Sequence, residues 1–209
     1  MGLEKEYVVK ARFGAVSDTL DREGNVIETG RVPEGELKLP TGELEQVPPK
    51  FSALHVDGKR AHQLAREGVD FELAPRKVRV DHFEEEARNG ASRTFRVRCG
   101  SGTYIRSLVA DLGDAYSEEL RRTAIGPFRL EDAFQESDAQ TLDLLDSLSQ
   151  VMPVVELESE QADALGHGRP VEMAVESRGP VAAVGTSGLV AIAEINDDGL
   201  LASSVGFVG

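Results

Sequence analysis

Apolar and polar residues alternate in several short stretches of the chain. Residues 5–14 alternate in this way and are rich in β-branched side chains, so they predict a half-buried strand. Residues 76–84 and 93–99 predict two more strands. The pair Asn89-Gly90 between them favours a hairpin, because the commonest tight hairpin turn needs a positive φ at both central residues.

Helical spacing follows directly after these strands. A helix is predicted to begin near Thr103, with Ser101 or Thr103 as its N-cap. Residues 59–67 are also helical by composition, and Gly68 suits the end of that helix. The apolar residues of the first helix recur at i, i+3, i+4 and i+7, at Ile105, Leu108, Val109 and Leu112.

The character of the sequence changes near residue 150. Residues 1–150 are expected to form an α+β domain, with a mixed, largely antiparallel sheet and packed helices, and residues 142–148 predict a short helix near its end. One more helix is expected at 158–165. The β-like runs that follow are short and separated by glycine, so residues 151–209 predict a small β-rich domain.

The composition is that of a globular protein, with 209 residues of which 40% are hydrophobic. No run of 18 apolar residues and no signal-peptide pattern occurs, so a soluble cytoplasmic protein without membrane contact is expected. The single cysteine, Cys99, cannot form an internal disulfide, which agrees with a reducing compartment. Neither a zinc-like ligand spacing nor a phosphate-binding glycine loop is present, so no metal and no cofactor are expected.

The net charge of −14 is unevenly distributed. Residues 1–130 contain 21 Lys and Arg against 22 Asp and Glu, whereas residues 131–209 contain 2 against 15. Phosphate contacts by Lys and Arg dominate the affinity of proteins for nucleic acid. If the chain binds nucleic acid, the basic surface therefore lies in the first part.

Arg106 is placed in the first turn of the predicted helix, near the positive end of the helix dipole. A cation is disfavoured there, so Arg106 is expected to have an anionic partner. An ordinary structural ion pair with an Asp or Glu is one explanation. A functional carboxylate is the other, and spacing alone leaves both open.

Several strings, taken in order, resemble the tRNA pseudouridine synthase B (TruB) family. The matches cover most of residues 5–130 and are weaker beyond. The strings are KEYVVKARFGAVSDTLDREG, EQVPPKFSALHVDGKRAHQLAREG, GTYIRSL and LRRTAIGPF, with LGHGRPV resembling a piece of the family's small C-terminal domain, which is PUA-like.

The resemblance implies a pseudouridine synthase fold, incomplete here, and isomerisation of a uridine to pseudouridine in the T loop of tRNA, at position 55. It also implies no cofactor, no metal and no obligate protein partner. The base must be flipped out of the loop to be reached. By matching positions, Tyr7 would stack on the flipped base, Arg106 would pair with the catalytic aspartate, and Tyr104 and Leu120 would line the pocket. The basic residues expected to contact the tRNA T arm are Lys59, Arg60, Arg121 and Arg122.

One departure from the family affects the expected activity. The family's nucleophilic aspartate lies in a Gly-Thr-Leu-Asp-Pro loop upstream of the Tyr7 segment, and that loop is not in this chain. Thr-Leu-Asp ends at Asp21 and again at Asp143, but neither has the flanking glycine and proline, and neither is assigned as the nucleophile. The chain is therefore expected to be an N-terminally truncated synthase that is inactive alone. The alternatives are a non-catalytic tRNA-binding or folding module, and a structural fragment without RNA affinity.

Overall fold

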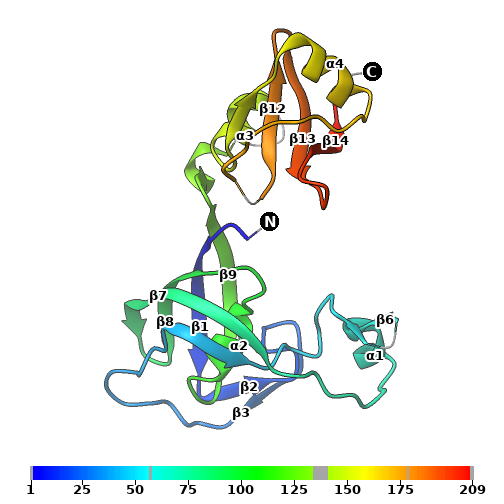
Figure 1. The fold of residues 1–209 in the computed structure, drawn as a ribbon. Coiled ribbons are helices and arrows are strands. Elements are labelled where there is room, and N and C mark those ends of the chain that lie inside the picture. The colour runs from blue at the N-terminus through cyan, green and yellow to red at the C-terminus, as the bar shows by residue number, and fades with distance from the viewer. Residues whose placement is uncertain (1, 57, 134–140, 178, 208–209) are drawn as a thin grey trace. The chain divides into compact units, whose positions relative to one another are not determined.

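The computed structural model describes residues 2–56, 58–133, 141–177 and 179–207. It divides into two compact units, residues 1–133 and 134–209, which are described separately below (Figure 1). The division falls after Ala133 and so precedes the predicted boundary near residue 150. The physical reason is that α3 (Leu144–Ser149) makes its tertiary contacts with strand β12 (Val181–Gly185) of the second unit.

The first unit is built on a six-stranded antiparallel sheet, and the second contains a sheet with one parallel pair, β11 and β12. The predicted α+β class with a largely antiparallel, mixed sheet content is therefore confirmed. The strand order in the first unit is β10-β9-β1-β8-β7-β4. The bounds are β1 Lys5–Phe13, β4 Gly42–Gln46, β7 Arg76–Asn89, β8 Ser92–Cys99, β9 Ala115–Ile125 and β10 Phe128–Arg129.

The predicted hairpin is present and joins strands β7 and β8. Strand β7 extends to Asn89, five residues beyond the predicted end, and Gly90 has a φ of 58° in the turn before β8. A positive φ is the conformation that makes glycine favourable at this position. Strand β1 pairs with both β8 and β9, so it lies in the middle of the sheet.

Alternation along the central strands separates an apolar face from a polar face. On β1, Val9, Ala11 and Phe13 are fully buried, whereas the residues between them are only partly buried. On β8, Phe95 and Val97 point to the same face, and helix α2 (Ile105–Ala110) covers it. Burial of aliphatic and aromatic side chains stabilises such a layer by about 1.5–3 kcal/mol per residue.

Helix α2 occupies the predicted position but begins in a different way. Its N-cap is Tyr104, which makes no side-chain capping bond. Thr103, one of the two predicted caps, instead donates its hydroxyl to the carbonyl of Gly100. The capping prediction is therefore wrong, because Thr103 Oγ1 is occupied by the loop that precedes the helix.

A smaller lobe of the first unit surrounds helix α1 (Ala61–Arg66), which lies inside the predicted helical stretch. Ala61, Leu64 and Phe71 form its separate small core. Gly68, with a φ of 71°, follows the helix as predicted. Short strands accompany these elements: β2 Ala15–Ser17 pairs with β3 Val26–Glu28, and β5 His55–Val56 pairs with β6 Lys59–Arg60. A short 3-10 helix, η1, spans Leu130–Asp132.

The second unit is a four-stranded sheet in the order β11-β12-β13-β14, with helix α4 packed on it. Its core includes Leu165, Val181, Ala191 and Leu201, which are fully buried. The short helices predicted at 142–148 and 158–165 are both present, shifted by one or two residues. The bounds are β11 Val154–Glu156, α4 Ser159–Gly166, β13 Gly188–Ile195 and β14 Leu201–Gly206.

No helix among the described residues is long and apolar enough to span a lipid bilayer. The acidic character is concentrated in the second unit, which has 2 Lys and Arg against 13 Asp and Glu by sequence. Residues 1–133 have 21 against 24. Any basic surface for a polyanion is therefore expected in the first unit.

Candidate active site

A cleft of about 630 Å³ opens in the first unit where the N-terminus of α2, the turn after β2 and the α1 lobe meet. Its volume is within the usual range for small-ligand sites. Two of the residues singled out from the sequence, Tyr104 and Arg106, lie in it. The full lining is Thr19, Asp21, Glu23, Phe51, Ser52, Ala53, His62, Arg66, Tyr104 and Arg106.

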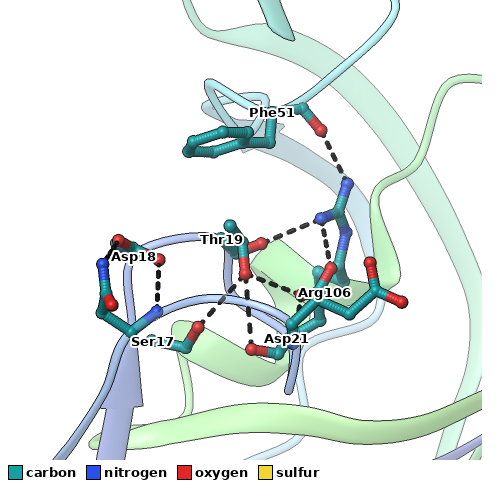
Figure 2. Close-up of polar contacts among 8 residues, drawn as sticks. Ser17, Asp18, Thr19, Asp21, Phe51 and Arg106 are labelled. Atoms are coloured by element: carbon teal, nitrogen blue, oxygen red, sulfur yellow. Dashed lines mark hydrogen bonds and ion pairs between the residues drawn. The ribbon is translucent and has the colours of Figure 1, made fainter. Parts of the chain in front are cut away.

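Arg106 is held on two sides of this cleft by three acceptors. Its Nη1 donates to the carboxylate Oδ2 of Asp21 at 2.6 Å and to the carbonyl of Thr19 at 2.8 Å. Its Nη2 donates to the carbonyl of Phe51 at 2.8 Å. Figure 2 shows the guanidinium between Phe51 on one side and Thr19 and Asp21 on the other. The planar fork of arginine therefore fixes two separate loops relative to α2.

Asp21 is the anionic partner that the sequence analysis required but did not identify. Within this chain the ion pair of Arg106 is internal, between residues 85 positions apart. Both side chains are about a quarter exposed, 21% for Arg106 and 25% for Asp21. The pair is thus screened less than a surface ion pair.

The turn that carries Asp21 is fixed by short polar side chains. Thr19 Oγ1 donates to Asp21 Oδ1 at 2.6 Å, and the backbone N–H of Glu23 donates to the same oxygen at 3.1 Å. On the other side of the turn, both oxygens of Asp18 accept hydrogen bonds from Asn25. Both oxygens of the Asp21 carboxylate are therefore occupied, Oδ1 by the turn and Oδ2 by Arg106.

The pKa of Asp21 reflects these contacts. Burial raises the pKa of the carboxyl, but the hydrogen bonds from Thr19 and Glu23 and the charge of Arg106 together outweigh burial. The net effect is a pKa below the ordinary value of 3.8. Asp21 is thus an ionised carboxylate at neutral pH, as Arg106 requires.

The start of α2 is anchored by the last residue of β4 and the residue after it. Gln46, which is 3% exposed, uses both ends of its amide on the backbone of Tyr104. Gln46 Nε2 donates to the Tyr104 carbonyl at 3.1 Å, and Gln46 Oε1 accepts from the Tyr104 N–H at 2.8 Å. Ser107 Oγ donates to the carbonyl of Val47 at 3.2 Å. These bonds fix the direction from which Arg106 enters the cleft.

The α1 lobe forms the remaining wall of the cleft. Ser52 is buried, and its carbonyl faces both the backbone N–H of His62 and His62 Nδ1, each at 3.0 Å. Phe51, the preceding residue, contributes its carbonyl to Arg106. Two consecutive carbonyl groups therefore connect α2 on one side with α1 on the other.

Tyr7 and Leu120 lie outside the lining of this cleft. Tyr7 is in the middle of the sheet and packs against the core that α2 covers. Leu120 is opposite Val9 on the neighbouring strand and is 44% exposed. The structure therefore brings Tyr104 and Arg106 together, and it places Tyr7 and Leu120 on the sheet beside α2.

The four basic residues expected to contact RNA occupy three different places. Lys59 and Arg60 are exposed on β6 in the α1 lobe, where Lys59 is 3.7 Å from Glu67. Arg122 is opposite Tyr7 and Arg121 is opposite Val8 on β1. Since adjacent residues of a strand point to opposite faces, Arg121 and Arg122 do not share a surface. Arg121 instead shares a hollow with Glu6 and Arg96.

Several residues of the site were not identified by sequence reasoning, among them Asp21 as the partner of Arg106, Gln46 as the anchor of Tyr104, and Ser52 in the cleft wall. Gln46 and Ser52 belong to the string EQVPPKFSAL, which was used only as a family signature. No group of three or more His, Cys, Asp or Glu placed to hold a metal ion was found within the described ranges.

Comparison with known proteins gives this geometry a context. The profile of the TruB family pseudouridylate synthase N-terminal domain matches residues 1–105. The tRNA pseudouridine synthase B of Rhodococcus jostii strain RHA1 is 36% identical over 223 residues, which cover 96% of this chain and 72% of that protein. The enzyme of the same name from Aromatoleum aromaticum is 35% identical, over 95% of this chain and 71% of that protein.

Solved structures show the same fold. A chain in a crystal structure of a Cbf5-Nop10-Gar1 complex superposes with a TM-score of 0.60 at 23% identity, over 98% of this chain and 66% of that one. The chain thus spans about two thirds to seven tenths of the length of these three proteins. At more than a third identity to curated relatives over nearly its whole length, and with the family profile matching its first half, this chain belongs to the TruB family of tRNA pseudouridine synthases.

Proposed function

We propose that this chain forms the part of a tRNA pseudouridine synthase that binds the T arm and holds a flipped uridine, at position 55, beside Arg106. The reaction of this family is an isomerisation in which the N1–C1′ glycosidic bond breaks, a C5–C1′ bond forms, and the proton lost from C5 is balanced by one gained at N1. No redox partner or cofactor is needed for that balance.

The observation that supports this proposal most directly is the position of Arg106. Its guanidinium lies in a cleft of nucleotide size, beside an ionised carboxylate and Tyr104. A fixed arginine keeps a neighbouring carboxylate ionised, so Arg106 would do the same for the aspartate of the family's Gly-Thr-Leu-Asp-Pro loop, because nucleophilic attack at a sugar carbon requires an ionised carboxylate. Tyr104 supplies an aromatic side chain in the same cleft for contact with a base.

Turnover by this chain alone is not expected. Asp21 is the carboxylate that contacts Arg106, and its two oxygens accept hydrogen bonds from Thr19, the Glu23 backbone and Arg106. An oxygen engaged in this way is a poor nucleophile, because attack requires those bonds to be released. Asp21 therefore positions Arg106 in this proposal, and the nucleophile is the aspartate of the family's Gly-Thr-Leu-Asp-Pro loop.

The position of Arg106 and Tyr104 in the cleft also supports a second candidate function, a tRNA-binding module without chemistry. The two are separated by an assay of a T-arm hairpin RNA that carries tritium at uracil C5. Binding of this hairpin in preference to one with a scrambled loop, with no tritium release, is expected of the chain itself. Release is expected once the chain is extended upstream by the family's loop, and Arg106→Ala in the extended protein abolishes it.

The outcomes divide clearly. Tritium release by the chain alone contradicts the assigned role of Asp21. Absence of release from the extended protein, with binding retained, favours the non-catalytic module. Equal affinity for the two hairpins contradicts T-loop recognition, which the comparisons do not test.

A further inference from the structure

The wall of the cleft opposite Asp21 has three polar groups that the proposed chemistry does not use. His62 and Arg66 are four residues apart on α1, so they lie on the same side of that helix, and both line the cleft. Ser52, from the preceding loop, lies beside them in the lining. No ion pair involves Arg66 within the described part of the chain, whereas Arg106 across the cleft forms an ion pair with Asp21.

Ser52 is unusual among these residues because its hydroxyl is buried without a partner. The residue is 5% exposed, and no hydrogen bond to Ser52 Oγ is present among the described residues. A buried hydroxyl without a partner destabilises the folded state. The oxygen is inaccessible in the free protein, so rotation of the Ser52 side chain toward the cleft would let a ligand supply the missing bond.

The orientation of His62 is fixed by the same loop. Its Nδ1 lies 3.0 Å from the Ser52 carbonyl, which can only accept, so Nδ1 must be the donor. Nε2 is then the nitrogen left for a ligand. It accepts in the neutral ring and donates in the imidazolium, so only the protonated ring offers a second N–H.

We propose that Ser52, His62 and Arg66 form a phosphate subsite, which binds a backbone phosphate next to the flipped uridine. This inference rests on the proposed function. A guanidinium, an imidazolium and a hydroxyl are donors suited to the oxygens of one phosphodiester. Arg106 is less suited to this task because both of its Nη atoms already donate hydrogen bonds, to Asp21, Thr19 and Phe51.

The subsite also places the phosphate at a defined location relative to the chemistry. The carbonyls of Phe51 and Ser52 bind Arg106 and His62 respectively, so the two walls of the cleft are connected through one peptide unit. A phosphate bound on the α1 side and a base held near Tyr104 would span the cleft. Binding energy from the phosphate then helps to position the sugar between them.

The first test uses charge-neutral backbone links. Hairpin RNAs are prepared with a single methylphosphonate at each position around the target uridine, and their affinities are measured with the wild-type chain and with Arg66→Gln. A methylphosphonate at one of these positions is expected to weaken wild-type binding about tenfold. The same modification should have little effect on the affinity of Arg66→Gln, because that variant has already lost the contact with the phosphate. Arg98→Gln, which removes an equal charge from an exposed strand position outside the cleft, serves as the matched control.

The second test separates binding from folding. Ser52→Ala is expected to leave the thermal midpoint unchanged or raised, because the hydroxyl has no partner in the free protein, and to weaken hairpin binding several-fold. His62→Gln removes the ring nitrogen Nε2 and is expected to weaken hairpin binding several-fold. The charged or titratable groups that line the cleft around His62 are Asp21, Glu23, Arg66, Tyr104 and Arg106.

The two proposals fail in different ways. If the wild type shows no preference for the T-arm hairpin, the proposed function is contradicted before any variant is considered. If that preference is present but Arg66→Gln and Arg98→Gln lose affinity equally and respond alike at every methylphosphonate position, the phosphate subsite is overturned. A lower thermal midpoint of Ser52→Ala with unchanged affinity would also overturn it, since the hydroxyl would then have an internal role.

Discussion

Arg106 Nη1 donates to Asp21 Oδ2 at 2.6 Å, and this contact joins the start of α2 to the turn after β2. The carboxylate is held in turn by Thr19 and the Glu23 backbone, so Arg106 is oriented by a carboxylate that is itself fixed. An arginine at the positive end of a helix is disfavoured without such a partner. Asp21 therefore has a structural role in this chain and a positioning role in the proposed reaction.

The first prediction concerns the pH dependence of this pair. The pKa of Asp21 lies below its ordinary value of 3.8, so the folded state binds this proton less readily than the unfolded state does. The stabilisation is complete above that ordinary value and is lost as the pH falls below it. Asp21→Asn is expected to lower the free energy of unfolding by about 2 kcal/mol at pH 7, a cost typical of losing hydrogen bonds to a charged group.

Urea unfolding of the wild type and Asp21→Asn at pH 7 and pH 3 measures this effect. The difference between them should be smaller at pH 3, because that pH lies below the ordinary carboxyl pKa of 3.8 and the unfolded-state carboxyl is then largely protonated. Asp143→Asn is the control for this measurement. It removes a carboxylate that caps the short helix α3 in the second unit and has no contact with Arg106. A stability difference for Asp21→Asn that is independent of pH would contradict the assigned ion pair.

A second prediction concerns Gly24, which lies in the turn that carries Asp21. A Cβ at this position would collide with the side-chain oxygens of Ser17, Asp18 and Thr19, which are engaged in the hydrogen bonds of the turn. Gly24→Ala is therefore expected to destabilise the first unit by about 1–3 kcal/mol, as overpacking does. Gly179→Ala, where an added Cβ meets nothing within 4 Å, is the matched control and should leave the unfolding midpoint unchanged.

The elements of the first unit were largely predictable because they depend on local patterns. The β7–β8 hairpin follows from alternation and from Asn89-Gly90, and helix α2 follows from the spacing of Ile105, Leu108 and Val109. Both signals act over a few residues. The predicted N-cap was wrong because Thr103 bonds to Gly100 and the start of the helix is held by Gln46, which lies far away in the sequence.

The site was predictable only in part, since its contacts join segments far apart in the chain. Arg106 was recognised as needing an anion, but Asp21 lies 85 residues before it and looks like any turn aspartate. Arg121 and Arg122 were both expected to contact the tRNA, but their strand β9 was identified only in the structure, and neighbours on a strand face opposite ways. Sequence spacing cannot show which loops meet.

A third prediction tests whether Gln46 fixes the start of α2. Gln46→Leu keeps a buried side chain of similar size but leaves both backbone groups of Tyr104 without their partner, and a cost of about 2 kcal/mol is expected. Gln46→Glu keeps the acceptor for the Tyr104 N–H and loses the donor for its carbonyl. In the upstream-extended protein, both changes are expected to lower kcat more than they raise KM, because Arg106 is displaced.

Thermal unfolding and steady-state kinetics of the same variants distinguish positioning from general destabilisation. Each variant is assayed well below its own unfolding midpoint, so that the folded fraction is the same. If kcat at that temperature equals the wild-type value, Gln46 contributes to stability alone. A loss of kcat with retained hairpin affinity supports the positioning role.

The last prediction uses the register of β9 to separate two adjacent arginines. Arg122 is opposite Tyr7, and Arg121 is opposite Val8 on the other face, where it shares a hollow with Glu6 and Arg96. Each phosphate contact changes the slope of log affinity against log salt by about 0.7–0.9. If the RNA lies on the Tyr7 face, Arg122→Gln should reduce the slope by that amount, and Arg121→Gln should leave it unchanged although both variants remove one positive charge.

Fluorescence titrations of the T-arm hairpin at several salt concentrations measure both slopes. Because the two residues are neighbours in sequence and differ only in the face they occupy, a reduced slope for Arg121→Gln alone would place the RNA on the opposite side of the sheet.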